Sequence, residues 1–580
     1  LADAVAASDT SEAFANQLTT FDLIGSAATF APDTNITTKG YLASGDGGSG
    51  SWIQNGVTGQ TPSQSPAQLG SALLNDGSGN QWKLVGEIGL AALGAPLNGT
   101  SDDVPYLLAM LGAIGTISIN NAKVGLGSQL SMPVGAKLIG YGADAEIIIL
   151  PSYNTASPSI ITWNTSTATN VRDDDGVLIK NIKFNGNRGN IEFPSKPTFL
   201  RLVKRVAPTV TGCTFIDFQG IAIADQGCLS ALITKNKFTN CAKETVESPV
   251  VFTQSWDPDG TLSIGTNITK NKFISNQFSP AYLNCDDGKF LNNYCSGNGE
   301  SGVFSANTRG VDISHNTIEG SILKVSAAQG VEIQNAIMAK ITSNTIKNTE
   351  RMGVSLNNCT DSVVSGNTIE DSSIITERNV AGEHQNCGII FVNEGGGACS
   401  DLIISGNIFK STAGIGQKYC ISSNTNGSSA SMDRIKISGN VMTDGYDKII
   451  GQPLRWFKTA KFSSSTFTDN TLDFFGAPTE GMWFVGAMFR NTPVAGGFLD
   501  NVYTTEGAIH SALWVTSTAF SAGRYILASN GRTYRVAISS GLSTVEPTAT
   551  ADYEVTTDGY TWEMINIAQA ESKGVSQIQS

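Results

Sequence analysis

The chain has 580 residues, more than one compact hydrophobic core usually holds, so an elongated body with appended domains is expected. Its formal net charge of −13 argues against a nucleic-acid partner, because phosphate binding needs a basic face. No apolar run approaches the roughly 18 residues of a membrane span, so membrane insertion is not expected. Only 15% of the residues are charged and 62 are glycine, which suits turn-dense β structure.

Residues 1–88 carry no repeat and are interpreted as an N-terminal neck or connector region. The chain starts with Leu1 rather than methionine, so we expect that a preceding part of the protein is missing. The Gly-rich stretch from Gly40 to Trp52 reads as a flexible turn before a strand. It lacks the Gly-Lys-Ser/Thr sequence of a phosphate-binding loop.

A short amphipathic helix is predicted next. Thr100 or Ser101 can cap it, and Asp102 and Asp103 complement its dipole. Residues 104–111 supply an apolar face, with which the helix would cover the open end of a stack of strands.

Strands are expected at residues 116–120, 137–140 and 146–150, and early coils at residues 176–184 and 210–215. A five-residue motif then recurs: Ser or Thr, any residue, Asn, any residue, then an apolar residue. Its asparagines are Asn236, Asn271, Asn316, Asn344, Asn367, Asn407 and Asn440, with a degenerate copy at Asn293. Such a repeat, without helical periodicity, indicates a solenoid of stacked strands.

The repeat also predicts the role of each position. The apolar residue two after each Asn should point inward and stack on its counterparts: Phe238, Phe273, Ile318, Ile346, Ile369, Phe409 and Met442. The Asn and the Gly that often precedes it should sit at the turn in left-handed geometry, and an Asn ladder should satisfy neighbouring backbone amides. His315 should be a solvated turn residue.

The nine cysteines all lie between Cys213 and Cys420, and several occupy repeat positions. They are expected to be buried free thiols rather than a disulfide framework. No Cys-x-x-Cys pair occurs and only three histidines are present, so neither a metal site nor a cofactor is expected. The repeat body is predicted to span residues 89–476. Residues 477–580 alternate apolar and polar residues, as in a small β-sandwich-like module for trimerisation or carbohydrate binding.

Four stretches together resemble bacteriophage tailspikes that depolymerise capsule or O-antigen. Tyr41 to Trp52 resembles the Gly-Asp-Gly-Gly segment ahead of many tailspike bodies, and Leu93 to Leu111 resembles the start of pectate-lyase-like phage proteins. Gly125 to Ala143 is similar to their first coil, and Gly531 to Trp562 to a small β module of phage tail proteins.

The resemblance implies an all-β fold, a right-handed single-stranded parallel β-helix. It further implies a homotrimer on the virion, attached to the tail through the missing N-terminal part and acting outside the cell. The partner would be a polysaccharide of the host bacterial surface. The catalytic positions of the family vary between members, so the resemblance carries over no residue.

Glycoside hydrolysis needs two carboxylates, a general acid and a base or nucleophile. Stacked coils lie about 4.8 Å apart, so coil spacing converts into carboxylate separation. Glu300 and Glu350 both precede a Gly-Val strand start, two coils apart, which suits an inverting enzyme. They are the leading candidates for catalysis, followed by Asp286 and Asp287 at a turn near the far end of a strand.

Six further residues are candidates for substrate binding. Glu244 would extend the acidic column, with Arg351 and His384 alongside, and Arg309 should stack on Asp286. Trp256 and Tyr282 are candidate sugar-stacking platforms, with core packing the alternative role for both.

The leading hypothesis is an endo-glycosidase that cleaves a bacterial capsule or O-antigen. A polysaccharide lyase is the second; it would use His384 or a tyrosine as base and Arg351 or Arg309 to neutralise a uronate. A non-catalytic adhesin is the third. The scarcity of histidine and the repeated acids favour hydrolysis.

Overall fold

A computed structural model describes residues 89–443 except 94, 157–158, 164–171, 173–175, 195, 243–248, 255–259, 321–328, 373–386, 394–396, 411–418 and 425–431, and parts of 17–85 and 446–578. The chain divides into two compact units, Leu1–Lys272 and Phe273–Ser580. Strand β23 (Lys272–Ile274) contains the boundary between them. The division into residues 1–88, 89–476 and 477–580 stays a prediction.

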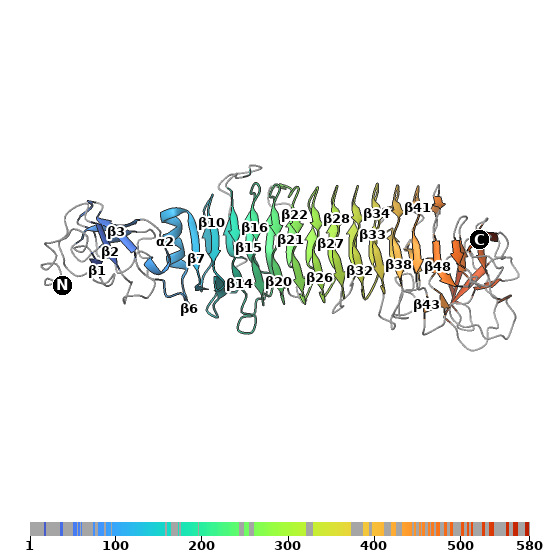
Figure 1. Ribbon diagram of the computed structural model, residues 1–580, viewed down its shortest axis with the longest axis horizontal. Coiled ribbons are helices and arrows are strands. Elements are labelled where there is room, and N and C mark those ends of the chain that lie inside the picture. Colours follow the sequence, from blue (N-terminus) through green and yellow to red (C-terminus); the bar gives the residue numbers. More distant parts are fainter. Residues whose placement is uncertain are drawn as a thin grey trace. The chain divides into compact units, whose positions relative to one another are not determined.

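Both units contain coils of a right-handed parallel β-helix, so the predicted all-β fold class is confirmed. Each coil contributes one strand to each of three parallel sheets, which we number in chain order as sheets 1, 2 and 3. Within each unit the corresponding strands of successive coils lie side by side (Figure 1). Among the described residues no helix is long and apolar enough to cross a membrane.

The first unit begins with a small five-stranded sheet that is mostly antiparallel. It comprises β1 (Gln17–Leu18), β2 (Asn35–Thr38), β3 (Gly50–Gln54), β4 (Leu73–Asn75) and β5 (Gln81–Val85). Only the β1–β2 pair in it is parallel. The 3-10 helix η3 (Ala91–Leu93) and the helix α2 follow. The expected strand after the Gly-rich stretch is therefore present as β3.

The strands of the first unit form three sets. Sheet 1 contains β7 (Thr116–Asn120), β10 (Lys137–Tyr141), β13 (Leu178–Lys180), β16 (Thr209–Thr211), β19 (Leu232–Thr234) and β22 (Asn267–Thr269). Sheet 2 contains β6 (Asn98–Asp102), β8 (Lys123–Leu126), β11 (Glu146–Ile149), β14 (Lys183–Asn185), β17 (Thr214–Ile216) and β20 (Lys237–Thr239). Sheet 3 contains β9 (Leu130–Met132), β12 (Ser159–Trp163), β15 (Thr198–Val203), β18 (Ile221–Gln226) and β21 (Val251–Gln254).

The second unit repeats this arrangement. Its sheet 1 contains β25 (Lys289–Leu291), β28 (Asp312–Ser314), β31 (Lys340–Thr342), β34 (Val363–Ser365), β37 (Ile403–Ser405), β41 (Lys436–Ser438) and β47 (Thr466–Thr468). Its sheet 2 contains β26 (Tyr294–Ser296), β29 (Thr317–Glu319), β32 (Thr345–Lys347), β35 (Thr368–Glu370), β38 (Ile408–Lys410), β42 (Val441–Thr443) and β48 (Thr471–Phe475). Its sheet 3 contains β24 (Ala281–Leu283), β27 (Val303–Ala306), β30 (Val331–Gln334), β33 (Val354–Asn357), β36 (Cys387–Val392), β39 (Tyr419–Asn424) and β45 (Arg455–Lys458).

The predicted helix is present as α2 (Val104–Ile114), but its cap differs from the prediction. Thr100 and Ser101 lie in strand β6, and Asp103 is the N-cap residue. The side chain of Asp102 accepts bonds from the backbone N–H groups of Val104 (3.2 Å) and Gly127 (2.9 Å). The carboxylate thus ties the helix start to the coil beneath it, which the local sequence could not reveal.

The five-residue motif around each Asn forms the bend between sheets 1 and 2. The residue before the Asn adopts the left-handed conformation, with φ of 57° at His315, 55° at Ser343 and 63° at Gly366. The Asn is itself buried inside the coil and is not left-handed, so that part of the prediction is wrong. His315 is exposed at this bend, as expected.

The predicted ladder of asparagines is confirmed. The Oδ1 atom of Asn316 accepts the backbone N–H of Asn293 at 2.8 Å, and the Nδ2 group of Asn316 donates to the Phe290 carbonyl at 2.7 Å. The backbone N–H of Asn316 donates in turn to Oδ1 of Asn344 at 2.9 Å. Each Asn therefore satisfies backbone groups that the tight bend leaves without a strand partner.

The inward stack is also as predicted. Six of the seven apolar residues two after the Asn are fully buried: Phe238, Phe273, Ile318, Ile346, Ile369 and Phe409. Met442 pairs with Phe409 in strand register, and its side chain lies outside the described part. In the first unit Phe184, Phe215 and Phe238 stack with ring centroids 4.7 and 4.9 Å apart. Burial of each such side chain contributes about 1.5–3 kcal/mol, so the column contributes substantially to the stability of the coils.

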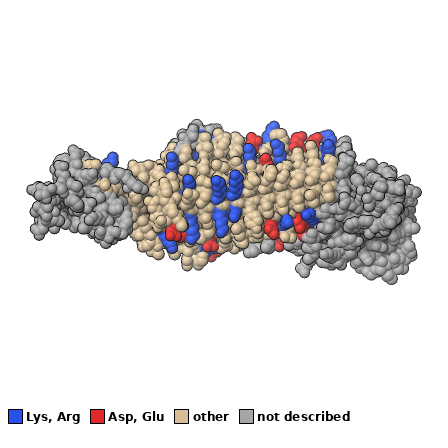
Figure 2. Space-filling view, viewed as in Figure 1, with Lys and Arg blue, Asp and Glu red and all other residues tan. Residues whose placement is uncertain are grey.

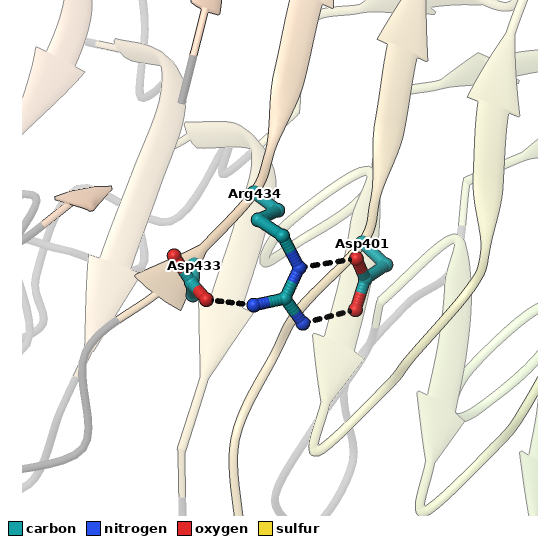
Figure 3. A network of polar contacts seen from close by, with 3 residues as sticks. All are labelled: Asp401, Asp433 and Arg434. Carbon is teal, nitrogen blue, oxygen red and sulfur yellow. Dashed lines mark hydrogen bonds and ion pairs between the residues drawn. The ribbon is translucent and has the colours of Figure 1, made fainter. Parts of the chain in front are cut away.

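The bend between sheets 3 and 1 carries an asparagine ladder at Asn307, Asn335 and Asn358, and a charged pair further along the coils. Arg434 bonds both carboxylate oxygens of Asp401 on the neighbouring coil, at 2.6 and 2.7 Å, and also Asp433 (Figure 3). The guanidinium holds the pKa of Asp401 below its usual range. Asp401 and Arg434 both have positive φ, so the ion pair links two strained bends on the surface.

The C-terminal region also forms strands. Five of them make one sheet: β53 (Ala512–Leu513), β54 (Tyr525–Leu527), β55 (Thr533–Ile538), β56 (Tyr553–Val555) and β57 (Thr561–Ile565). The pairs β54–β55, β55–β57 and β56–β57 are antiparallel. Further strands here are β40 (Met432–Asp433), β43 (Tyr446–Asp447), β44 (Gln452–Pro453), β46 (Phe462–Ser463), β49 (Gly481–Trp483), β50 (Met488–Arg490), β51 (Asp500–Tyr503), β52 (Gly507–Ile509) and β58 (Val575–Ile578).

Candidate functional site

The outward face of sheet 3 in the second unit carries an aromatic and acidic column. Strands β24, β27 and β30 pair in parallel, and their register places Tyr282 beside Phe304 and Phe304 beside Glu332. The alternation of strand side chains explains this face: Val331 and Ile333 are fully buried, so Glu332 between them points outward. The rings of Tyr282 and Phe304 lie 4.6 Å apart and are half-buried.

Two glutamates are anchored by buried serines next to this column. The Ser279 hydroxyl donates to Oε2 of Glu300 at 2.7 Å, and the Ser301 hydroxyl lies 2.9 Å from Oε2 of Glu332. By strand register Ser279 and Ser301 occupy the same position on neighbouring coils. Both serines are buried, so each holds a carboxylate in one orientation. We call Glu300, Glu332, their two serines and Tyr282 the glutamate cluster.

Ser301 can donate only one proton, which limits what its neighbours can do. Its oxygen lies 2.9 Å from Oε1 of Gln329 as well as 2.9 Å from Oε2 of Glu332. The Nε2 group of Gln334 donates to the other oxygen of Glu332 at 2.8 Å. The Gln334 amide therefore orients one oxygen of Glu332, and the other oxygen shares the single Ser301 proton with Gln329.

The electrostatics link the aromatic and acidic parts of the cluster. Burial raises the pKa of the Tyr282 phenol, and the negative charge of Glu332 raises it further. Tyr282 therefore stays protonated at neutral pH and can donate a hydrogen bond. A raised pKa also makes it a poorer candidate for a general base.

The predicted acids fall in three places. Glu300 lies in the cluster. Glu350 precedes β33, whose Val354 pairs with Val331, which in turn pairs with Val303, so it is two coils from Glu300 as expected. Asp286 and Asp287 lie beyond the other end of β24, at the bend towards sheet 1.

The remaining predicted residues divide similarly. The backbone N–H of Arg309 donates to Oδ1 of Asp286 at 3.0 Å, which confirms the expected stacking of these two positions. Arg309 is exposed at that bend, whereas Arg351 is half-buried before β33. Glu244, Trp256 and His384 lie outside the described residues.

Sequence reasoning missed Glu332. It concentrated on turn residues, where insertions interrupt the repeat, and ignored the outward positions of sheet 3. The sequence does contain one indication of its position. Gly302-Val303 and Gly330-Val331 are the same dipeptide, and aligning the two places Glu332 beside Phe304. The strand pairing in the structure shows that this alignment is the correct register.

Comparisons with known proteins agree with the fold. A family model described as "Right handed beta helix region" matches residues 255–373. A search of the curated proteins found no match. The family match covers part of the chain and supports the β-helix only.

Several solved structures match this chain at low identity. The A-module of the Azotobacter vinelandii mannuronan C-5 epimerase AlgE6 is 13% identical with a TM-score of 0.47; the match covers 66% of this chain and 99% of that one. The tailspike of E. coli bacteriophage HK620, solved with a hexasaccharide, is 12% identical with a TM-score of 0.47, covering 83% and 89%. The Streptococcus pneumoniae surface adhesin PfbA is 13% identical with a TM-score of 0.43, covering 73% and 98%. An epimerase, a tailspike and an adhesin appear together, so these likenesses assign no activity.

Proposed function

We propose that this protein is a polysaccharide depolymerase, an endo-glycosidase whose catalytic carboxylates are Glu300 and Glu332. One observation carries the proposal: Glu300 and Glu332 each accept a hydrogen bond from a buried serine at the same position of neighbouring coils, and Glu332 lies in strand register with the Tyr282–Phe304 pair. Carboxylates supply acid and base, and aromatic faces suit the C–H face of a sugar ring.

The two glutamates would divide the chemistry as glycosidases generally do. One carboxyl group, protonated, gives its proton to the leaving glycosidic oxygen, and the other, ionised, activates water or attacks the anomeric carbon. Glu332 suits the ionised role, since Gln334 donates to one of its oxygens and Ser301 can donate to the other. Glu300 then suits the acid. Glu350 is the alternative second carboxylate, at the two-coil spacing.

The wider setting belongs to the same proposal. The tailspike-like stretches of the sequence support a homotrimer on a phage tail that acts on capsule or O-antigen at the host surface. Asp286, Asp287, Arg309 and Arg351 would then contact distant parts of a long substrate or stabilise the bends. Lyase activity is the second candidate; the raised pKa of Tyr282 disfavours that residue as its base.

The experiment is incubation of the protein with a panel of purified bacterial capsular polysaccharides and O-antigens. New reducing ends without ultraviolet absorbance indicate a hydrolase. Glu300→Gln and Glu332→Gln should each lower the rate roughly 100-fold or more, because acid–base groups contribute that much. Glu319→Gln, on sheet 2 of the same unit, is the matched control and should keep full activity.

The other outcomes decide against the proposal. Ultraviolet absorbance from an unsaturated uronate would identify a lyase, and unchanged polymer length with tight binding would identify an adhesin. Full activity in both glutamine variants, with folding intact, would remove the glutamate cluster from the mechanism.

A further inference from the structure

Four lysines form a compact basic corner in the first unit, where sheet 1 bends into sheet 2. The sequence Thr-Lys-Asn-Lys-Phe occurs twice, at residues 234–238 and 269–273. Lys235 and Lys270 have φ of 58° and are exposed at the bend, and Lys237 and Lys272 are exposed at the start of the next strand. We call these four residues the lysine corner.

The two copies lie on neighbouring coils. The backbone N–H of Lys235 donates to the Thr269 carbonyl at 3.2 Å, and that of Lys272 donates to the Asn236 carbonyl at 2.9 Å. Lys235 therefore stacks on Lys270 and Lys237 on Lys272, at the coil rise of about 4.8 Å. Figure 2 shows lysine and arginine side chains gathered in neighbouring columns near the middle of the face in view.

The fold does not require lysine at these positions. In three copies of the second unit the residue before the Asn is His315, Ser343 or Gly366, and the residue after it is threonine. Those copies make the same bend and the same Asn ladder. The bend and the Asn ladder therefore form without lysine at these two positions.

Their charges also oppose the fold. Stacked lysines bring like charges onto neighbouring coils, where they repel each other. Lys183 on the same sheet is paired with Glu146 at 2.9 Å, but no described carboxylate forms an ion pair with any of the four. An anionic ligand running along the coils would relieve this repulsion.

We propose that the lysine corner binds a carboxylate-bearing, acidic polysaccharide. This deepens the proposed function, on which it rests for the polymer class. A linear polymer with regularly spaced carboxylates matches charges that repeat along the coil axis. Nucleic acid fits less well, because the chain has a net charge of −13 and the corner is narrow.

The test is direct binding of the full chain to polygalacturonate and alginate, with dextran as the neutral polymer and duplex DNA as the other polyanion. The variant K235Q/K237Q/K270Q/K272Q should bind both uronate polymers roughly tenfold or more weakly at low salt, because it loses four exposed charges that attract the carboxylates. Wild-type binding should weaken as salt screens it.

The matched control changes four other exposed lysines, K123Q/K137Q/K289Q/K436Q, and removes the same total charge. It should bind as the wild type does. Equal loss in both variants, no binding of the wild type to either uronate polymer, or equally tight lysine-dependent binding of DNA would overturn the inference.

Binding is measured apart from cleavage, so the two proposals fail separately. Glu300→Gln should keep wild-type affinity for the uronate polymers, because its carboxylate lies in the second unit and not in the lysine corner. Lost cleavage with retained lysine-dependent binding supports both proposals. Lysine-dependent binding without any cleavage by the wild type supports the lysine corner alone.

Discussion

Asp103 is a residue whose ionised side chain destabilises the folded protein because it is buried. It is fully buried at the N-cap of α2, where its Oδ2 accepts the Gly125 N–H at 2.8 Å. Burial raises its pKa from 3.8 to about 6 despite that hydrogen bond. The residue therefore fixes the helix start, but its negative charge is unfavourable in the folded protein.

Asp103→Asn should remove a pH dependence of stability. Because the folded pKa is raised, the contribution of Asp103 is most favourable below about pH 4 and is lost as pH rises through about 6, by at most about 3 kcal/mol. Denaturant unfolding of wild type and variant at pH 4 and 7.5 measures it. Asp144→Asn is an exposed control, and an identical pH dependence in wild type and Asp103→Asn would contradict the expectation.

At the scale of the element, the bend between sheets 1 and 2 is the repeating unit of the fold. It combines a left-handed residue, a buried Asn and a short strand with one inward apolar side chain. The Asn gives the bend its hydrogen bonds, and the left-handed residue gives it its direction. Charge or size at the left-handed position is therefore free to vary, as the lysine corner illustrates.

Asn316→Ala should be strongly destabilising. It leaves the Asn293 N–H and the Phe290 carbonyl without their partner inside the coil. Each unsatisfied buried group costs about 1–3 kcal/mol, so a loss of about 2–5 kcal/mol is expected in chemical or thermal unfolding. His315→Asn, at the exposed position next to it, should change stability little. Comparable stability of Asn316→Ala and wild type would show that water replaces the ladder.

At the scale of the whole molecule, the reactivity of the nine cysteines depends on whether the coils are folded. All nine are free and buried. Burial raises the pKa of Cys213 and Cys241 to about 12 and that of Cys399 to about 11, so their thiolate forms are scarce at neutral pH. They act as small apolar side chains in the stack, as the sequence predicted.

Native protein should therefore react very slowly with a thiol-specific disulfide reagent at pH 8, and all nine thiols should react after denaturation. Opening of coils is needed for access, so the slow phase also measures their local stability. A count below nine in denaturant would reveal a disulfide. Rapid reaction of several thiols in the native state would show that the coils open readily.

The sequence by itself determined the repeat and most of the scaffold. The five-residue motif around each Asn predicted the solenoid, the inward stack and the free thiols, because these depend on which residue recurs at a fixed position. It also located α2, although its cap depends on contacts with Gly125 and Gly127 in the next coil. The left-handed geometry predicted for the residue before the Asn is present, whereas the Asn itself does not adopt it, since sequence alone does not show which residue the bend strains.

Only the tertiary structure decided which side chains meet. Glu332 lies 32 residues after Glu300 in the chain, since 332 − 300 = 32, and two buried serines at equivalent positions of neighbouring coils bond their carboxylates. The lysine corner likewise joins residues 35 apart, since 270 − 235 = 35. Irregular loops change the number of residues per coil, so distance along the chain does not give distance in space. Backbone hydrogen bonds between coils fix the register, and the register brings these groups together.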